Sequence, residues 1–469
     1  MNRITKALSL TVVLSVLPVI GVASTFPSEP PAPATPKNFM LPEVEHFTLE
    51  NGMEVSLIPY GTTPKSTMML HFDTGNENDG DKRGLSDITF ELLNKGTSSL
   101  SASDIAKQAA SMGGQVTTSA GMNTSRIAID VLSEFNEQAV ALLADLVGNS
   151  EFSEADLERA VANQWRQIEV SKSRAQGQAV EAFYEAMYPA HPYGRIFPTN
   201  EELTRISRDD VLAFSSRYLN GSHAHLYIAG QFDSQSLKQA ITGAFASLPA
   251  GTKTDSIAPP APAPASQLVM IPRDGAVQST VRLGQRSIPA ADDKYVALEV
   301  MNTLLGGMFS SRITQNIRED KGYTYSPRSA VFSHDGAAVW YQSADIQAES
   351  TGEAINEIVS EIAGLQQTPP PAEELQGVKN YMSGLFVLRN SSRSGVIAQL
   401  VNLNIHGLPK SRLTNYISLV NDVSAETVSE AARNYLDLNT MSLIVVGDPE
   451  QMQTELSVVE NLPATQSEK

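Results

Sequence analysis

The stretch from Gly84 to Thr97 reads GLSDITFELLNKGT and is the most informative part of this chain. We interpret it as a helix on which Asp87 and Glu91, four residues apart, lie one above the other. Two carboxylates at this spacing are typical of a solvated polar face. With Gln167 nearby, they would also suit an oxygen-ligand site for Ca²⁺ or Mg²⁺, which is the less favoured interpretation.

Two similar segments of the sequence indicate that part of the chain is duplicated. The segments DDVLAFSSRYLNGSHAHLYIAGQFD and AETVSEAARNYLDLNTMSLIVVGDPE both read as an amphipathic helix, a turn, an apolar strand and a Gly-led exit. Tyr218 and Tyr435 are 217 residues apart (435 − 218), and Gly230 and Gly447 are separated by the same interval. A period this long exceeds that of solenoid repeats, so it predicts duplication of a whole domain.

The order of segments predicts two domains joined by a linker. The Pro-rich tract IAPPAPAPAS, Ile257 to Ser266, reads as an extended, semi-rigid connection. Strand-like runs alternate with long helical patterns on both sides of it, as in layered sheet-and-helix domains. The predicted boundaries are a signal peptide at 1–24, a Pro-rich leader at 25–40, an N-terminal domain at 41–255, a linker at 256–267 and a C-terminal domain at 268–469.

The N-terminus predicts export. Arg3 and Lys6 precede an apolar run, Ala7 to Ala23, which ends in small residues. The alternative is a retained membrane anchor, although the run of about 17 residues is shorter than the roughly 20 that a spanning helix needs. A chain of this size without Cys suggests a bacterial periplasm, with no membrane association after signal cleavage.

The net charge of the chain argues against some classes of binding partner. The chain has 34 basic and 52 acidic residues, for a net charge of −18. Loss of Arg3 and Lys6 with the signal leaves 32 basic residues (34 − 2) and a charge of −20. This balance argues against binding to nucleic acid or to anionic membrane surfaces, and we interpret it mainly as a solubility feature.

The opening stretch resembles the motif helix of the pitrilysin and insulin-degrading enzyme family, the insulinases. There it typically reads GLAHFLEHMLFKGT, with an inverted His-x-x-Glu-His motif. The resemblance places Asp87 and Glu91 at the two histidine positions and Phe90 at the general-base glutamate. Counting back from the shared HPYG landmark, His191 to Gly194, places the third ligand of the family, a glutamate, at Gln167.

These substitutions remove the zinc chemistry that the family motif supplies. Two histidines four apart share one Zn²⁺, and the intervening Glu takes a proton from the metal-bound water. Phenylalanine cannot accept a proton, and a neutral amide is a poor exchange for a carboxylate on zinc. The family's substrate-aligning Asn-Ala pair also reads Thr117-Thr118. We therefore expect no intact catalytic residues and no bound metal or other cofactor in this chain.

The second half keeps a different part of the family pattern. LLGGMFSSRITQNIREDKGYTYS, Leu304 to Ser326, is similar to the family's LLGGGFSSRLFQELREKRGLAYS. By position, Arg318 and Tyr325 match an Arg and a Tyr that grip the substrate beside the zinc. A guanidinium and a phenol are suitable donors to a peptide carbonyl or an oxyanion. The alternative is that Arg318 pairs with a neighbouring acid such as Glu319 while Tyr325 packs at a strand end.

The resemblance implies a fold and a function. The expected fold is α+β, with two homologous domains, each a largely antiparallel sheet with helices packed on one face. The expected function is that of a non-catalytic, periplasmic subunit that forms a heterodimer with a zinc-bearing homologue and binds a peptide substrate through Arg318 and Tyr325. The alternatives are a scaffold or peptide-binding protein, and a peptidase acting alone through a rebuilt site.

Other kinds of metal-binding or catalytic site have weaker support in the sequence. His223 and His225 alternate on a presumed strand, a spacing that can hold a metal. By comparison with the similar segment of the second half, Ala224 and Leu226 lie on the apolar face of this strand. We therefore expect the two histidines on the opposite face of the strand, without a metal. The sequence contains no Gly-x-Ser-x-Gly elbow, no phosphate-binding glycine frame and no Cys.

Overall fold

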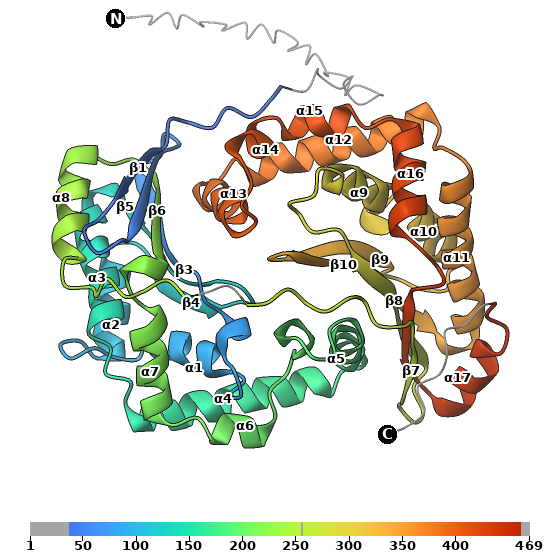
Figure 1. Cartoon of the computed structure of the whole chain (residues 1–469), viewed down its shortest axis with the longest axis horizontal. Helices are drawn as coiled ribbons and strands as arrows, with labels where there is room; N and C mark the ends of the chain where they lie inside the picture. Colours follow the sequence, from blue (N-terminus) through green and yellow to red (C-terminus); the bar gives the residue numbers. More distant parts are fainter. Residues whose placement is uncertain (1–36, 255–256, 461–469) are drawn as a thin grey trace, which may run out of the picture. The chain divides into compact units, whose positions relative to one another are not determined.

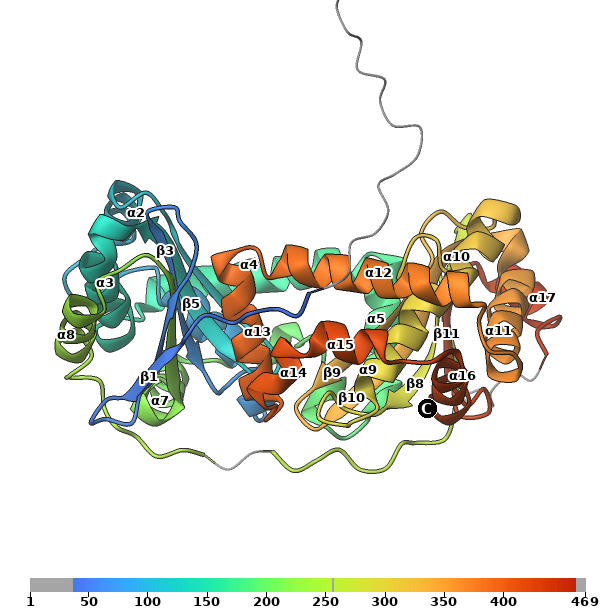
Figure 2. The same ribbon diagram turned by 90° about the horizontal axis from the view of Figure 1, so that it is seen from above.

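The computed structural model describes residues 37–254 and 257–460 (Figure 1). The predicted signal peptide, 1–24, and most of the Pro-rich leader lie outside the described residues. Across the two described ranges, no helix has both the length and the apolar character needed to cross a membrane. Residues 257–266 form neither helix nor strand and can be followed in Figure 2 as an extended segment.

The first half is built on a six-stranded sheet in the order β1-β2-β6-β3-β5-β4. Only β2 and β6 pair in parallel, and every other neighbouring pair is antiparallel. The strands are β1 (Glu45–Thr48), β2 (Glu54–Pro59), β3 (Lys65–Phe72), β4 (Val116–Ala120), β5 (Ser125–Leu132) and β6 (Ala224–Gly230). The helices are α1 (Leu85–Leu92), α2 (Ala102–Ser111), α3 (Asn136–Gly148), α4 (Glu154–Lys172), α5 (Ala175–Met187), α6 (Asn200–Thr204), α7 (Arg208–Tyr218) and α8 (Ser234–Ala244).

The second half repeats this plan with a five-stranded sheet in the order β7-β11-β8-β10-β9, in which only β7 and β11 are parallel. The strands are β7 (Leu268–Pro272), β8 (Gln278–Ser287), β9 (Arg328–His334), β10 (Ala337–Gln347) and β11 (Ser442–Gly447). The helices are α9 (Tyr295–Asn302), α10 (Arg312–Thr314), α11 (Thr351–Gln367), α12 (Ala372–Arg389), α13 (Arg393–Ile405), α14 (Lys410–Thr414), α15 (Tyr416–Asn421), α16 (Ala425–Tyr435) and α17 (Pro449–Leu456). Two π-helical segments, η5 (Thr303–Gly307) and η6 (Gln315–Asp320), follow α9.

The α+β fold class predicted from the sequence is confirmed. The two similar segments of the sequence also form equivalent elements of structure. Helix α7 leads into β6 in the first half, and α16 leads into β11 in the second. Both helices begin at a capping serine, Ser207 or Ser424, whose side chain accepts a backbone N–H of the first turn. Each returning strand, β6 or β11, lies in the interior of its sheet.

The structure adds one feature to the expected layers, because each sheet is covered on a second face by a helix from the other half. Helix α5 packs Phe183 and Met187 against Val339 of β10 and against Ile444 and Val446 of β11. In return, α13 packs its apolar residues against β2, β3 and β6, in a cluster that contains Val396, Ile397, Ile58, Met69 and Tyr227. All six residues of β11 are buried, as expected for a strand covered on both faces.

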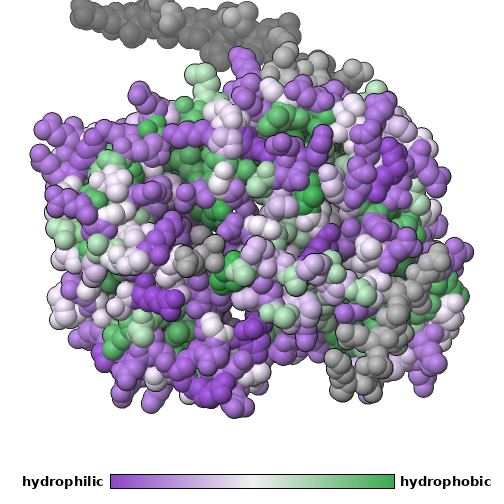
Figure 3. All heavy atoms as spheres, in the orientation of Figure 1, coloured by the Kyte–Doolittle hydropathy of each residue, from purple (hydrophilic) through white to green (hydrophobic). Residues whose placement is uncertain are grey.

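The face drawn in Figure 3 is mostly hydrophilic, with smaller apolar areas scattered over it.

Candidate functional site

The motif stretch forms α1, and buried hydrogen bonds fix where this helix begins. Gly84, with φ 90°, is the N-cap residue, and its backbone N–H donates to one oxygen of Asp79 at 2.8 Å. The other oxygen of Asp79 accepts the backbone N–H of Ser86, also at 2.8 Å. Burial raises the pKa of Asp79 to about 7 despite these two donors. Asp79 therefore serves to position α1.

Asp87 faces a cavity of about 620 Å³ whose other lining residues include Asn76, Glu77 and Arg195. Its Oδ2 accepts hydrogen bonds from Asn76 Nδ2 at 2.7 Å and from Gln164 Nε2 at 3.3 Å. Burial raises the pKa of this carboxyl to about 6, and the nearby Glu91 adds to the effect. Two neutral amides therefore hold the carboxyl at the first histidine position.

Glu91 and Gln167, the other two positions that match zinc ligands of the family, make no hydrogen bond to Asp87 in the part of the chain that the structure describes. Glu91 lies 3.3 Å from Lys95 Nζ, its neighbour one turn along the chain. Gln167 is exposed on α4, and the residue of α4 that reaches Asp87 is Gln164, one turn earlier. Within residues 37–254 and 257–460, no group of three or more His, Asp or Glu side chains is arranged to hold a metal ion.

Phe90, at the general-base position, belongs to the core. Its side chain is fully buried, and its ring centroid lies 5.9 Å from that of Phe72 on β3. An apolar side chain in this position stabilises the packing of α1 on the sheet and offers no proton acceptor.

The HPYG landmark connects the cavity beside α1 to the second half. Tyr193 contacts the Glu77 carboxylate at 3.3 Å and donates to the Asp335 carbonyl, between β9 and β10, at 3.0 Å. Asn123 donates to the same Glu77 oxygen at 2.7 Å. Burial raises the pKa of Glu77 to about 7. No pattern in the sequence indicates this link, because HPYG serves there only to locate the third ligand position of the family.

Arg318 and Tyr325 do lie together. Arg318 stands on η6, and its guanidinium carbon lies 4.6 Å from the centroid of the Tyr325 ring and 4.4 Å from that of Phe309. Its Nε lies 3.2 Å from Glu319, so the predicted alternative pairing is also present. Tyr325 is 78% exposed and Phe309 is 61% exposed, whereas the Arg318 side chain is 23% exposed. The half-buried guanidinium therefore lies close to two solvent-facing rings. Phe309 was not singled out from the sequence, although it lies in the LLGGMFSSR stretch.

Three further residues that the sequence singled out have ordinary structural surroundings. Thr117 and Thr118 lie on β4, the edge strand of the first sheet, where Thr117 Oγ1 contacts the Ala128 carbonyl at 3.4 Å. His223 is buried just before β6, and its Nδ1 lies 2.9 Å from Asn220 Oδ1. His223 thus has a structural partner.

His225 belongs to a polar row that crosses the edge of the first sheet. Its Nδ1 lies 3.0 Å from Glu54, and its Nε2 lies 2.7 Å from Ser56 Oγ. Ser56 also contacts His46 Nδ1 at 2.9 Å, and His46 Nε2 lies 3.0 Å from Lys410 Nζ on α14. The order Glu, His, Ser matches that of a hydrolase triad, but Ser56 is fully buried and cannot reach a substrate. The row instead ties the sheet to α14.

Two similar α+β halves, a motif helix that carries Asp87 and Glu91, and a contact between Arg318 and Tyr325 are the features of a zinc-peptidase-like protein. The family described as insulinase (peptidase family M16) matches residues 55–198, and the peptidase M16 inactive domain matches residues 205–382. The chain belongs to the insulinase family.

Relatives agree with this assignment. The chain is 24% identical over 393 residues to the uncharacterized zinc protease YmxG of Bacillus subtilis, covering 83% of this chain and 95% of that protein. Its fold is similar to that of a peptidase M16 inactive domain from Pseudomonas fluorescens, with TM-score 0.80, 21% identity and coverage of 86% and 98%. It is also similar to the periplasmic protease PqqL of Escherichia coli, with TM-score 0.74 and 16% identity, covering 94% of this chain and 49% of that one.

Proposed function

We propose that this chain is the non-catalytic subunit of a heterodimeric zinc peptidase, in which a homologous subunit carries the zinc. In this proposal Arg318 and Tyr325 bind the peptide substrate beside the metal of the partner. The contact of the half-buried Arg318 guanidinium with the exposed rings of Phe309 and Tyr325 is the observation that carries the proposal.

The stack suits a role in substrate binding. The Nε of Arg318 faces Glu319, while its two Nη atoms make no hydrogen bond to any residue that the structure describes. Two rings lie close to the guanidinium and restrict its movement before a ligand arrives. A preoriented guanidinium beside a phenol can donate to a peptide carbonyl and to the oxyanion that develops from it.

The opposite side of the site supports the same division of labour. Asp87 is held by two amides, Phe90 lies in the core and Glu91 pairs with Lys95, which supports the proposal that the metal is held by the partner. The similarity to PqqL covers 49% of that chain, which leaves room for a second unit of comparable size within one polypeptide. In our proposal, a zinc-bearing homologous unit takes that complementary place beside the unit described here.

The proposed location is the periplasm. It is supported by the signal-like order of residues 1–24, with basic residues, an apolar run and a small-residue exit. The similarity in fold to a periplasmic protease is in keeping with it. Mass spectrometry of the N-terminus of the chain from a periplasmic extract would test both cleavage and location.

The experiment that tests the proposal compares this chain alone, the closest zinc-motif homologue from the same genome alone, and a mixture of the two. We expect no zinc and no peptide hydrolysis from this chain alone, and a gain of activity on mixing. Arg318→Ala should remove most of that gain, while Tyr325→Phe should keep the stacked ring and lose the contribution of the hydroxyl. Arg159→Ala, an exposed arginine on α4, is the matched control.

Two other functions give different results in the same experiment. A scaffold or peptide-binding protein would bind partners without any gain of hydrolysis, and Arg318→Ala would have no effect on catalysis. A peptidase acting alone would show chelator-sensitive cleavage that disappears with Asp87→Ala. The amide partners of Asp87 make the second of these the weaker alternative.

A further inference from the structure

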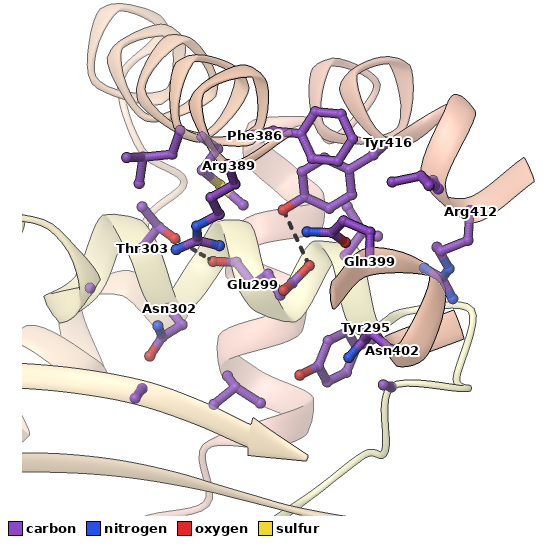
Figure 4. A pocket seen from close by; sticks show the side chains of 18 of the residues that line it. Tyr295, Glu299, Asn302, Thr303, Phe386, Arg389, Gln399, Asn402, Arg412 and Tyr416 are labelled. Atoms are coloured by element: carbon purple, nitrogen blue, oxygen red, sulfur yellow. Dashed lines mark hydrogen bonds between the residues drawn. The ribbon is translucent and has the colours of Figure 1, made fainter. Parts of the chain in front are cut away.

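A second cavity, of about 630 Å³, lies within the C-terminal half and has no role in the proposed function. Residues of α9, β9, α12, α13 and α14 line it, and Figure 4 shows ten of the side chains by name. Its volume is typical of pockets that hold small organic ligands. By the duplication, its position beside α9 and β9 corresponds to that of the altered zinc site beside α1 and β4 in the first half.

The wall of this cavity is partly apolar. Met382 and Phe386 of α12, Leu403 of α13 and Val331 of β9 all contribute to it. Phe386 stacks on the ring of Tyr416 with 4.7 Å between centroids, which gives the wall a flat aromatic surface. A ligand that fills the cavity therefore needs an apolar body.

The charges in the cavity are unbalanced toward positive. Arg328, Arg389 and Arg412 line it, and Glu299 is its one lining acid. Glu299 accepts a hydrogen bond from the Tyr416 hydroxyl at 3.4 Å, and burial raises its pKa to about 7. None of the three arginines forms an ion pair with a residue in the described ranges. Arg328 and Arg389 are solvent-exposed, so an anionic ligand in the cavity can meet guanidinium groups that hold no ion pair.

Arg389 is better placed than Arg412 to meet that charge. Arg412 already donates to the Asp292 carbonyl at 3.0 Å. Arg389, the last residue of α12, makes no side-chain hydrogen bond within residues 37–254 and 257–460, and Figure 4 shows it directed into the cavity toward Glu299 and Thr303. Gln399 and Asn402 of α13 line the same space and carry amide donors.

We propose that this cavity binds a carboxylate with an apolar body, with the carboxylate on Arg389 and the body against Phe386 and Met382. A guanidinium can hold a carboxylate through two parallel hydrogen bonds, which gives this anion an advantage over a halide or another spherical ion. The carboxylate has two sources with the same chemistry: the C-terminal residue of a peptide and a free carboxylic acid.

Isothermal titration calorimetry of the full chain alone, without any partner subunit, tests the proposal and is independent of the proposed pairing. The probes are N-acetyl-phenylalanine, its C-terminal amide and decanoate. We expect at least one acid to bind and the amide to fail. Binding of N-acetyl-phenylalanine would identify peptide C-termini as the source, and binding of decanoate alone would identify free acids.

Variants locate the site. Arg389→Gln should weaken binding of the acid at least about tenfold, and Arg389→Lys should weaken it less, because the charge remains while the two-point contact is lost. Arg166→Gln, an exposed arginine on α4, is the control and should bind normally. Equal binding of acid and amide, no binding of either acid, or unchanged binding by Arg389→Gln would each overturn the proposal.

Discussion

Gly177 and Gly395 occupy equivalent places in the two halves, 218 residues apart (395 − 177). Each is the third residue of a helix, α5 or α13, that packs on the sheet of the other half. A Cβ atom at Gly177 would lie 2.0 Å from the Ser171 carbonyl oxygen, and one at Gly395 would lie 1.8 Å from the Arg389 carbonyl oxygen. The same close approach of backbone to backbone occurs where α4 leads into α5 and where α12 leads into α13.

We expect Gly177→Ala and Gly395→Ala each to destabilise the protein by about 2 to 3 kcal/mol, because the clash is with backbone and would displace the crossing helix. Gly384→Ala is the control, since Gly384 lies within α12 with no atom close to its missing Cβ. That variant should be up to about 1 kcal/mol more stable. Urea denaturation measures all three, and a harmless Gly177→Ala would show that α5 is free to shift.

Phe90→Glu, which restores the general base of the family motif by identity, should cost at least about 3 to 5 kcal/mol because it removes a fully buried ring and buries a carboxyl group. Phe90→Leu is the matched control and should cost about 1 to 2 kcal/mol. Thermal unfolding gives the order of the two variants, and zinc analysis should find no metal in either. Equal stability of the two would show that Phe90 is not part of the core.

The sequence was sufficient for the fold class, the family and the repeated order of helix and strand, because these depend on periodicity and on motifs that lie close together in the chain. Arg318 and Tyr325 are seven residues apart, so their contact also follows from a local stretch. The reach of α4 to Asp87 depends on the rotation of a helix about its axis. Counting residues places the third ligand position of the family at Gln167, and the structure shows that Gln164, three positions earlier, is the residue that contacts Asp87.

Features that join distant segments could not be derived from the sequence. The crossing of α5 and α13 depends on which face of each sheet remains uncovered, and apolar strands such as LYIAG do not say which helix will cover them. The cavity around Glu299 and Arg389 combines residues 90 positions apart (389 − 299) whose spacing follows no known motif. Both required the tertiary structure.

Asp87→Asn should stabilise the protein at neutral pH. Burial raises the pKa of Asp87 from its usual value near 3.8 to about 6, so above pH 6 the folded state bears the full cost of ionising it. The variant should gain up to about 3 kcal/mol at pH 7.5, and the gain should shrink between pH 6 and 4, where the wild-type carboxyl takes up its proton. Denaturant titrations across this range measure the difference. The exposed Asp81 supplies the control, because Asp81→Asn should show a much smaller effect.

His71→Phe should show the opposite dependence on pH. Burial lowers the pKa of His71 to about 3, with Arg126 and His225 adding to the effect, and its two ring nitrogens have no hydrogen-bond partner among the described residues. The stability that depends on a neutral His71 is therefore complete above the unfolded-state pKa near 6.5 and is lost as the pH falls from 6.5 toward 3.

Phenylalanine at position 71 keeps an aromatic ring for the edge contact with Tyr227, 5.7 Å away between centroids, and cannot be protonated. The variant should match the wild type within about 1 kcal/mol at pH 8 and exceed it by a further 2 to 3 kcal/mol or so near pH 4.5. Asp87→Asn loses its advantage over the same range, so the two variants measured side by side separate the burial of a base from that of an acid. A constant difference between His71→Phe and the wild type from pH 8 to 4.5 would show that His71 accepts a proton in the folded protein as readily as in the unfolded chain.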